Sequence, residues 1–426
     1  MLASADITGR FSVLVATSTL PPVNHQVRLL LFWGFLLTLP LAASAQRRDF
    51  AGQYRHQKIL VDSRREGDSL RVYLRFPDGS ALRQKQPLRV LAWPAYDARR
   101  PLWADTVSQL ARRLRSEGPA ARVEFCLPMA RLQAGTVLSI ACGPASAAVS
   151  GEAAWLPLTA ARLARPYVLT DSLGAPLLRH TVRAGEAFFV DRYGPEQPVN
   201  VKQYTTPFVA ALPPHADPLR QSAGPATLAV SDSLYARAGV ALALPEPGLY
   251  TLRLAGEPSM LGLLVTGAEY PDLTTADELI QPLIYLTTSA ERKKLYEAPN
   301  PKKAVDEFWL KAAAGQQTLA RQAIRLYYSR AATANQLFAA HKAGWMTDRG
   351  MLYMVLGVPD AVYRTAQEER WVYHARDNGS SATYTFRPKP STFAPEHYEL
   401  VRRPENERLW YAAVEQWRKA MTAPGR

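Results

Sequence analysis

The stretch Gly344-Trp345-Met346-Thr347-Asp348-Arg349-Gly350, followed by Met351-Leu352-Tyr353-Met354-Val355-Leu356-Gly357-Val358-Pro359-Asp360, decides how the C-terminal part of the chain folds. Sequence with helical periodicity precedes it, and sequence typical of short strands follows. Two glycines, a tryptophan and an Asp-Arg pair within seven residues are typical of a tight connection between two elements. We therefore predict a turn over residues 344–350, between a long helix and a strand at Leu352 to Leu356.

Each residue of this turn has a structural interpretation. Gly344 could adopt the left-handed conformation that ends a helix. Thr347 and Asp348 could accept hydrogen bonds from the following amides and from Arg349, and Gly350 could let the chain enter the strand. This interpretation makes the stretch a brace between a helix and a sheet.

The competing interpretation is a functional site. Asp348 and Arg349 would then form a polar pair at the mouth of a cleft. The residues expected around this cleft are Trp309, Trp345, Asp360, Trp371 and His374. Because Asp-Arg pairs in turns more often brace loops, and because His374 has no partner identifiable from the sequence, we prefer the structural interpretation.

The chain upstream of residue 272 is typical of β-structure. Short alternating runs separated by turn signals predict one antiparallel β-sandwich-like module over residues 46–160 and a second over residues 161–271. The runs are 70–76, 88–93, 123–127 and 136–141 in the first module, and 167–170, 187–190 and 199–204 in the second. The second module closes with a Pro-Gly turn before Tyr250, which suits the corner of a sandwich, while residues 105–116 have helical spacing.

Residues 272–426 predict an α+β domain, in which a helical segment packs on a small antiparallel sheet. Thr288-Ser289-Ala290-Glu291 is a capping box, and Asn300-Pro301 begins the next helix. The predicted helices are 302–314, 318–342 and 407–421, and the predicted strands are 352–356, 361–364, 370–374, 382–387 and 397–401. The fold class is thus mostly β plus α+β.

The N-terminal sequence predicts export. Arg28 precedes an apolar run that ends at Ala43-Ser44-Ala45, a pattern typical of a cleaved signal peptide. A membrane-spanning helix is the alternative, but a span needs about 20 apolar residues and Pro40 interrupts this run. We therefore expect residues 1–45 to be a surplus start plus signal peptide, and the mature protein to be periplasmic or secreted and not membrane-spanning.

Cysteine usage and charge bear on the compartment and the partners. Cys126 and Cys142 lie in one predicted hairpin, where they form either a disulfide or two buried thiols. The chain has 51 Lys and Arg against 37 Asp and Glu, a formal charge of +14. An exported protein does not meet cytoplasmic nucleic acid, so the expected partner is an unknown protein or an anionic envelope component. The arginine clusters 47–48, 64–65, 99–100 and 112–115 are otherwise a solvated surface.

The sequence lacks the spacings of common catalytic motifs. It has no HExxH, no GxSxG, no phosphate-binding loop, no SxxK and no paired cysteines with zinc spacing. The seven histidines are scattered, so a metal site would need ligands from distant segments. We predict no cofactor and no metal.

The same residues resemble a known family. Gly344, Trp345, Thr347 and Asp348 match the Gly-Trp-x-Thr-Asp motif of the bacterial GWxTD domain. Further matches are Arg349, Gly350, Tyr353, Gly357, Pro359 and Asp360, the Phe308-Trp309 pair, the segment Arg330 to Asn335, and Trp371 with Tyr373. The resemblance covers about residues 272–385. It implies an exported protein, commonly of Bacteroidetes-type bacteria, and it carries over no activity.

Three functions fit the sequence. The first is a non-enzymatic envelope or secreted module for binding or assembly. The second is a hydrolase-like or lyase-like enzyme with a cleft around Asp348, Arg349 and His374. The third is a periplasmic assembly partner that docks through its basic face. An enzyme requires Asp348, Asp360 and His374 to face one pocket, so the structure can discriminate the second function from the others.

Overall fold

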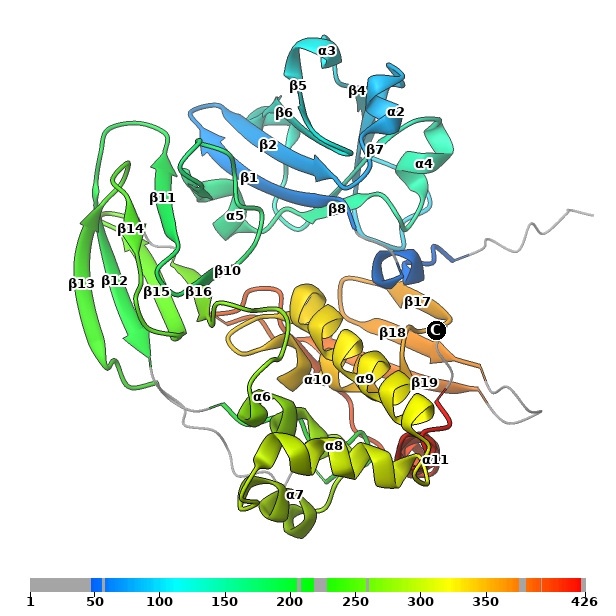
Figure 1. The fold of residues 1–426 in the computed structure, drawn as a ribbon. Coiled ribbons are helices and arrows are strands. Elements are labelled where there is room, and N and C mark those ends of the chain that lie inside the picture. Colours follow the sequence, from blue (N-terminus) through cyan, green and yellow to red (C-terminus); the bar gives the residue numbers. More distant parts are fainter. Residues whose placement is uncertain are drawn as a thin grey trace, which may run out of the picture. The chain divides into compact units, whose positions relative to one another are not determined.

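The computed structural model describes residues 47–55, 58–204, 208–217, 228–257, 260–374, 381–391 and 393–422. Two β-rich regions are followed by helices and a small sheet, which confirms the predicted fold class (Figure 1). The predicted signal peptide lies outside the described residues. Within the described ranges, no helix combines the length and the hydrophobicity needed to cross a bilayer.

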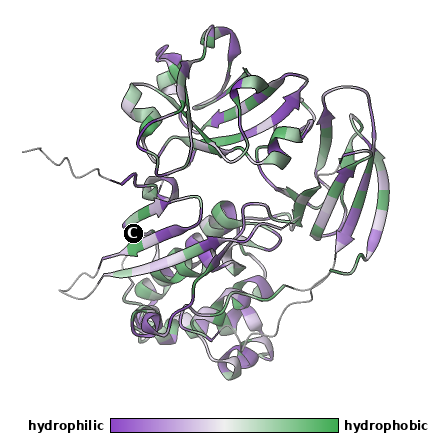
Figure 2. Ribbon diagram, turned by 180° about the vertical axis from the view of Figure 1, so that it is seen from behind, coloured by the Kyte–Doolittle hydropathy of each residue, from purple (hydrophilic) through white to green (hydrophobic). Residues whose placement is uncertain are grey.

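The first β region is a sandwich of two antiparallel sheets, with strand orders β1-β2-β6-β5 and β4-β3-β7-β8. Its strands are β1 Leu60–Glu66, β2 Ser69–Phe76, β3 Leu88–Trp93, β4 Trp103–Thr106, β5 Leu114–Glu117, β6 Ala120–Pro128, β7 Val137–Cys142 and β8 Ala154–Pro157. Its short helices are α2 Ser80–Arg83, α3 Leu110–Arg113, α4 Ala145–Val149 and α5 Ala160–Ala164. Both sheets contribute to one core, in which Leu70 and Val72 of β2 meet Leu88 and Val90 of β3. The hydropathy of the residues varies along the strands, because successive side chains point to opposite faces of a sheet (Figure 2).

The helix predicted over residues 105–116 is wrong. Only Leu110–Arg113 is helical, and Leu114 already begins β5, which pairs with β6. The apolar residues Val107, Leu110 and Leu114 all pack against the sandwich core, so their three- and four-residue spacing imitates a helix.

The hairpin predicted to join the two cysteines is also wrong. Cys126 lies on β6 of one sheet and Cys142 at the end of β7 of the other, and both thiols are free. Cys126 is exposed and Cys142 half-buried, so neither the disulfide nor a pair of buried neighbouring thiols is found.

The second β region also has two sheets, with orders β10-β16-β15-β12-β13 and β14-β11-β9. Its strands are β9 Tyr167–Thr170, β10 Thr181–Arg183, β11 Ala187–Arg192, β12 Pro198–Tyr204, β13 Asp232–Arg237, β14 Leu242–Ala243, β15 Gly248–Leu254 and β16 Leu261–Thr266. All pairs are antiparallel except β10 with β16. The Tyr250 hydroxyl donates to the Glu246 carbonyl at 2.9 Å, which is the bond of a tyrosine corner.

The C-terminal region packs helices on one face of the antiparallel sheet β17-β18-β19-β20 (Figure 1). Its helices are α6 Ala276–Ile280, α7 Ser289–Tyr296, α8 Pro301–Ala312, α9 Gln317–Phe338, α10 Asp348–Leu356 and α11 Glu407–Arg418. Its strands are β17 Ala361–Arg364, β18 Glu369–Tyr373, β19 Ala382–Pro388 and β20 Tyr398–Leu400. Thr288 and Glu291 form the predicted capping box, and the Asn300 side chain caps α8. Phe338 of α9 packs on Trp371 of β18, which joins the helical layer to the sheet.

The strand predicted at Leu352 to Leu356 is a helix in the structure. Residues Asp348–Leu356 form α10, of nine residues, and Met351, Leu352 and Met354 are each 0% exposed. A helix buried on every side shows no alternation of apolar and polar residues, so its sequence resembles that of a buried strand.

The segment Arg47–Arg55, here called the anchor segment, contacts the C-terminal sheet. The Phe50 amide donates to the Val362 carbonyl, and the Val362 amide donates to Asp49 Oδ1, both at 2.8 Å. The anchor segment thereby covers the outer edge of β17. The Tyr54 ring packs against Phe338 and Trp371, at centroid distances of 5.6 and 5.1 Å.

Candidate functional site

Thr347 fixes the start of α10. Its Oγ1 accepts the Gly350 amide at 3.1 Å and donates to the Gly344 carbonyl at 2.7 Å. The side chain thus satisfies one free amide of the first turn and bonds the preceding 3-10 turn, Gly344–Met346. The predicted capping role of Thr347 is confirmed, although the element it caps is a helix.

The glycines of the motif allow backbones to touch. A Cβ on Gly344 would lie 1.9 Å from the Ala334 carbonyl oxygen of α9, and a Cβ on Gly350 would lie 1.9 Å from the Gly344 oxygen. The predicted left-handed helix end at Gly344 is therefore wrong, since close approach explains the residue. The left-handed conformation is found at Gly357, with φ +88°, where α10 ends.

Asn335 and Trp345 hold the turn against α9. Asn335 Oδ1 accepts the Trp345 amide at 3.3 Å, and its Nδ2 donates to the Pro271 carbonyl at 2.9 Å. Trp345 is 4% exposed, and the Tyr285 hydroxyl donates to its carbonyl at 3.0 Å. Trp345 is therefore a core residue of the junction.

Three side chains bind the carbonyls at the end of α10. Arg330 donates to Met354 O at 3.1 Å, Trp417 Nε1 donates to Val355 O at 3.0 Å, and the Tyr373 hydroxyl donates to Gly357 O at 2.9 Å. A cation near the C-terminus of a helix also interacts favourably with its dipole. Arg330, Trp417 and Tyr373 thus satisfy a helix end that is buried.

Asp348 and Arg349 do not form the predicted pair. Asp348 Oδ2 accepts the Leu400 amide of β20 at 2.8 Å, and its carboxylate forms an ion pair with Arg402. The Asp348 and Arg402 side chains are only 8% and 9% exposed. Asp348 is therefore a buried link between the start of α10 and β20.

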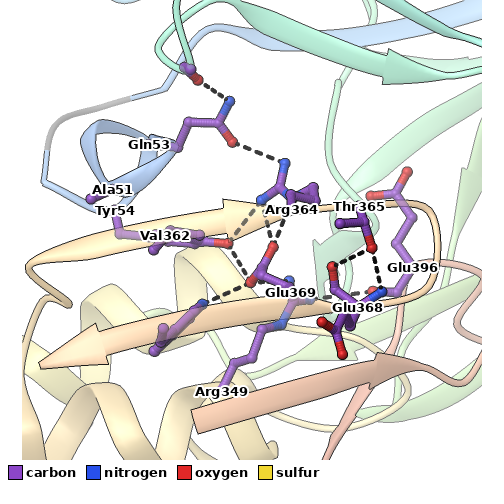
Figure 3. A network of polar contacts seen from close by, with 12 residues as sticks. Ala51, Gln53, Tyr54, Arg349, Val362, Arg364, Thr365, Glu368, Glu369 and Glu396 are labelled. Atoms are coloured by element: carbon purple, nitrogen blue, oxygen red, sulfur yellow. Dashed lines mark hydrogen bonds and ion pairs between the residues drawn. The ribbon is translucent and has the colours of Figure 1, made fainter. Parts of the chain in front are cut away.

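Arg349 instead faces a buried carboxylate that sequence reasoning missed (Figure 3). Glu369 is 0% exposed and accepts from Tyr54 Oη at 2.9 Å, Trp371 Nε1 at 2.8 Å and Arg364 Nε at 2.7 Å. Arg349 Nη1 lies 3.7 Å from the same carboxylate. Glu369, Trp371 and Tyr373 are every second residue of β18, so their side chains point to the same, buried face of the sheet. This alternation was the signal in the sequence that could have identified Glu369 as buried.

The Glu369 carboxylate remains charged inside the protein. Burial raises its pKa, but the charges of Arg364 and Arg349 outweigh burial, and the pKa falls to about 2. Burial acts against the charge of Arg364, but Glu369 holds the pKa of Arg364 well above its ordinary value. The buried Glu369 carboxylate is thus paired with two arginines, and the anchor segment contributes Tyr54 to the same network.

The remaining candidate residues do not converge on Asp348. Trp309 and Trp371 are 0% exposed and belong to the core. Asp360 Oδ2 accepts the His374 amide at 2.7 Å and lies 3.5 Å from His374 Nδ1. Asp348 begins α10, which is about 13 Å long, and Asp360 follows its other end.

A second segment, here called the strap, lies against the motif. It consists of residues 208–217, which lie between strands β12 and β13 of the second β region. The Ala211 amide donates to the Met346 carbonyl at 2.9 Å. Arg402, which Asp348 binds, donates to the Leu212 carbonyl at 3.1 Å. The motif thus borders the strap on one side and the Glu369 network on the other.

Two of the four predicted basic clusters contribute an arginine with a structural role. The Arg48 guanidinium lies over Trp93 and Trp155, and Arg64 is paired with Glu66 and Asp191. The side chains that stay exposed are Arg47, Arg65, Arg99, Arg100, Arg112 and Arg115. Within the described part of the chain, no cluster of three or more His, Cys, Asp or Glu could hold a metal ion.

A comparison with known protein families identifies the domain that contains the motif. Residues 248–419 match the model of the GWxTD domain. The chain carries a GWxTD domain. The match extends beyond the predicted residues 272–385 on both sides and takes in β15, β16 and α11. A search of the curated proteins found no match to this chain.

Proposed function

We propose that this GWxTD protein is an exported cell-envelope or secreted module for binding or assembly, and not an enzyme. The observation that supports this proposal is the use of Asp348. Both oxygens of its buried carboxylate are occupied by the Leu400 amide and the Arg402 guanidinium. A carboxylate held in this way braces the junction between α10 and β20 and is not presented to a substrate.

The hydrolase-like or lyase-like alternative fits the geometry less well. It needs Asp348, Arg349 and His374 around one cleft. Asp348 bonds to Arg402, Arg349 faces Glu369, and His374 bonds to Asp360 beyond the opposite end of α10. These contacts favour the binding module.

Export is proposed from the sequence of residues 28–46, and an anionic envelope component or a protein is the proposed partner. Arg112 on α3 and Arg115 on β5 support an anionic partner because both are exposed. Their charge would attract such a component at long range and at low ionic strength.

The substitution Asp348→Asn tests the role of the motif. We expect it to lower the free energy of unfolding by about 3 kcal/mol, because Arg402 would lose its buried counter-charge. Asp306→Asn, at an exposed position of α8, is the matched control and should change stability by less than about 0.5 kcal/mol. Chemical unfolding of the full mature chain measures both variants.

Capture of partners from envelope extracts completes the test. Asp348→Asn should retain wild-type partners at temperatures where it stays folded. Charge reversal at Arg112, Arg113 and Arg115 should remove an anionic partner, and unchanged partners would contradict that part of the proposal. A stable Asp348→Asn variant that has lost a cellular phenotype would instead favour the enzyme.

A further inference from the structure

We propose that the GWxTD domain binds an extended, proline-containing peptide beside its motif, and that the strap occupies this site as an intramolecular ligand. The site, here called the peptide groove, consists of Lys342, Met346, Arg402, Arg403, Asn406 and Tyr411. This inference rests on the proposed function as a binding module and specifies the ligand of that module.

The strap has the conformation of a bound peptide. It has no regular secondary structure from Phe208 to Pro213 and turns at Pro214. Phe208 is half-buried, and Ala211 and Pro214 are buried. Val209, between Phe208 and Ala211, is 65% exposed. The two buried residues, Ala211 and Pro214, are three positions apart, which is the period of a polyproline II helix.

The groove donates hydrogen bonds to backbone carbonyls of the strap. Lys342 Nζ donates to Val209 O at 2.9 Å, and Arg402 Nη2 donates to Leu212 O at 3.1 Å. The Arg403 amide and Asn406 Nδ2 both donate to the Pro214 carbonyl, at 3.0 and 3.4 Å. Contacts to carbonyls tolerate many side chains, so other extended segments can satisfy the same donors.

Proline suits this pattern of bonds. The strap uses the Ala211 amide as a donor to Met346, whereas Pro213 and Pro214 have no amide hydrogen to leave unpaired. Proline also restricts the free peptide to extended conformations, which lowers the entropy lost on binding. Ring contacts hold both ends of the strap. The Phe208 ring lies 5.0 Å from that of His341, and the His215 ring lies 5.1 Å from that of Tyr411.

The groove belongs to the domain and the strap does not. The family match, residues 248–419, includes every groove residue and excludes residues 208–217. The motif itself builds the groove, because Met346 supplies the acceptor carbonyl and Asp348 holds Arg402 toward the strap. The domain therefore carries the binding site, and this chain supplies its own occupant.

The test opens the groove and adds the ligand separately. In the full mature chain, residues 208–217 are replaced by ten residues of Gly and Ser, and a labelled synthetic peptide of residues 208–217 is titrated while its fluorescence anisotropy is followed. We expect saturable binding to the opened variant. The wild type should bind at least about tenfold more weakly, because its own strap competes at an effective concentration of order millimolar.

Single substitutions in the opened variant locate the site. Lys342→Met should weaken binding about tenfold, the effect of losing one hydrogen bond to a charged group, and Asn406→Ala should weaken it severalfold. Lys311→Met, at an exposed lysine of α8, is the control and should leave the affinity unchanged. A peptide with Gly in place of both prolines should bind less tightly than the native peptide.

Two results would overturn the inference. One is a folded opened variant, with an intact circular dichroism spectrum, that does not bind the peptide. The other is binding that survives both Lys342→Met and Asn406→Ala. If the opened variant does not fold, Ala211→Pro in the intact chain replaces it, because this substitution removes the bond to Met346 and loosens the strap. Failure of the folded Ala211→Pro variant to bind the peptide would then overturn the inference.

The two proposals fail separately. A variant that retains envelope partners without binding the peptide contradicts only the peptide groove. Peptide binding by a protein that captures no partner from extracts contradicts the proposed function and leaves the groove standing.

Discussion

Two segments from outside the matched domain lie against it, and they are held in different ways. The anchor segment inserts side chains, with Phe50 at 0% and Tyr54 at 7% exposure, and Tyr54 donates to the buried Glu369. The strap contributes backbone carbonyls, to which Lys342, Arg402 and Asn406 of the domain donate hydrogen bonds. A buried aromatic side chain fits one cavity, whereas a bound backbone can be replaced by another. The anchor segment is therefore part of the fold, and the strap resembles a ligand.

The largest effect should follow the loss of the Tyr54 ring. Tyr54→Ala removes a buried ring that packs against both Phe338 and Trp371, and we expect it to lower the free energy of unfolding by about 3–5 kcal/mol. Tyr54→Phe keeps the ring and loses the two bonds of the hydroxyl, which donates to Glu369 and accepts from Arg364, so it should cost about 1–3 kcal/mol. Urea unfolding monitored by tryptophan fluorescence compares the two variants. Equal losses would show that the hydroxyl, not the ring, holds the anchor segment.

A pH titration addresses the charge beneath the anchor segment. The pKa of Glu369 is about 2 in the folded protein against 4.5 ordinarily, so the unfolded state binds more protons between these values. The stability due to this group is present above pH 4.5 and is lost as the pH falls toward about 2, a change of about 3 kcal/mol. Glu369→Gln should lose this pH dependence within the same window. A wild-type slope retained by the variant would assign the effect to other carboxylates.

The smallest effect is expected at the strap. Lys342→Met keeps the aliphatic stem and removes the bond to Val209 O, and it should lower the free energy of unfolding by about 1–2 kcal/mol. The same urea experiment measures it. A loss as large as that of Tyr54→Ala would erase the distinction between anchor segment and strap.

The sequence predicted the elements whose periodicity is visible. Helices α8, α9 and α11 each have one apolar face and were found within a few residues of their ends. The capping box of Thr288 and Glu291 and the alternating strands β2, β3 and β12 were predicted for the same reason. Helix α10 was not, because its residues Met351 to Val355 are buried on all sides and show no period.

The candidate site was predicted only where its bonds are local. The role of Thr347 follows from its spacing to Gly350 along the chain. The partners of Asp348 and Arg349 could not be predicted, because Arg402 and Glu369 are distant in sequence and reach the motif only through the fold. Gly344 was correctly singled out for the wrong reason, since helix ends and close backbone contacts both select glycine.

The family match begins at Gly248, the first residue of β15, inside a five-stranded sheet. The hairpin of β15 and β16 is inherited with the domain, while its neighbours β12 and β10 come from upstream sequence. Gly262 of this hairpin touches the carbonyl of Phe393, so the hairpin is also fixed to the domain. In this chain the residues before Gly248 supply a strand to each side of the hairpin, so strand pairing couples the upstream β region to the domain.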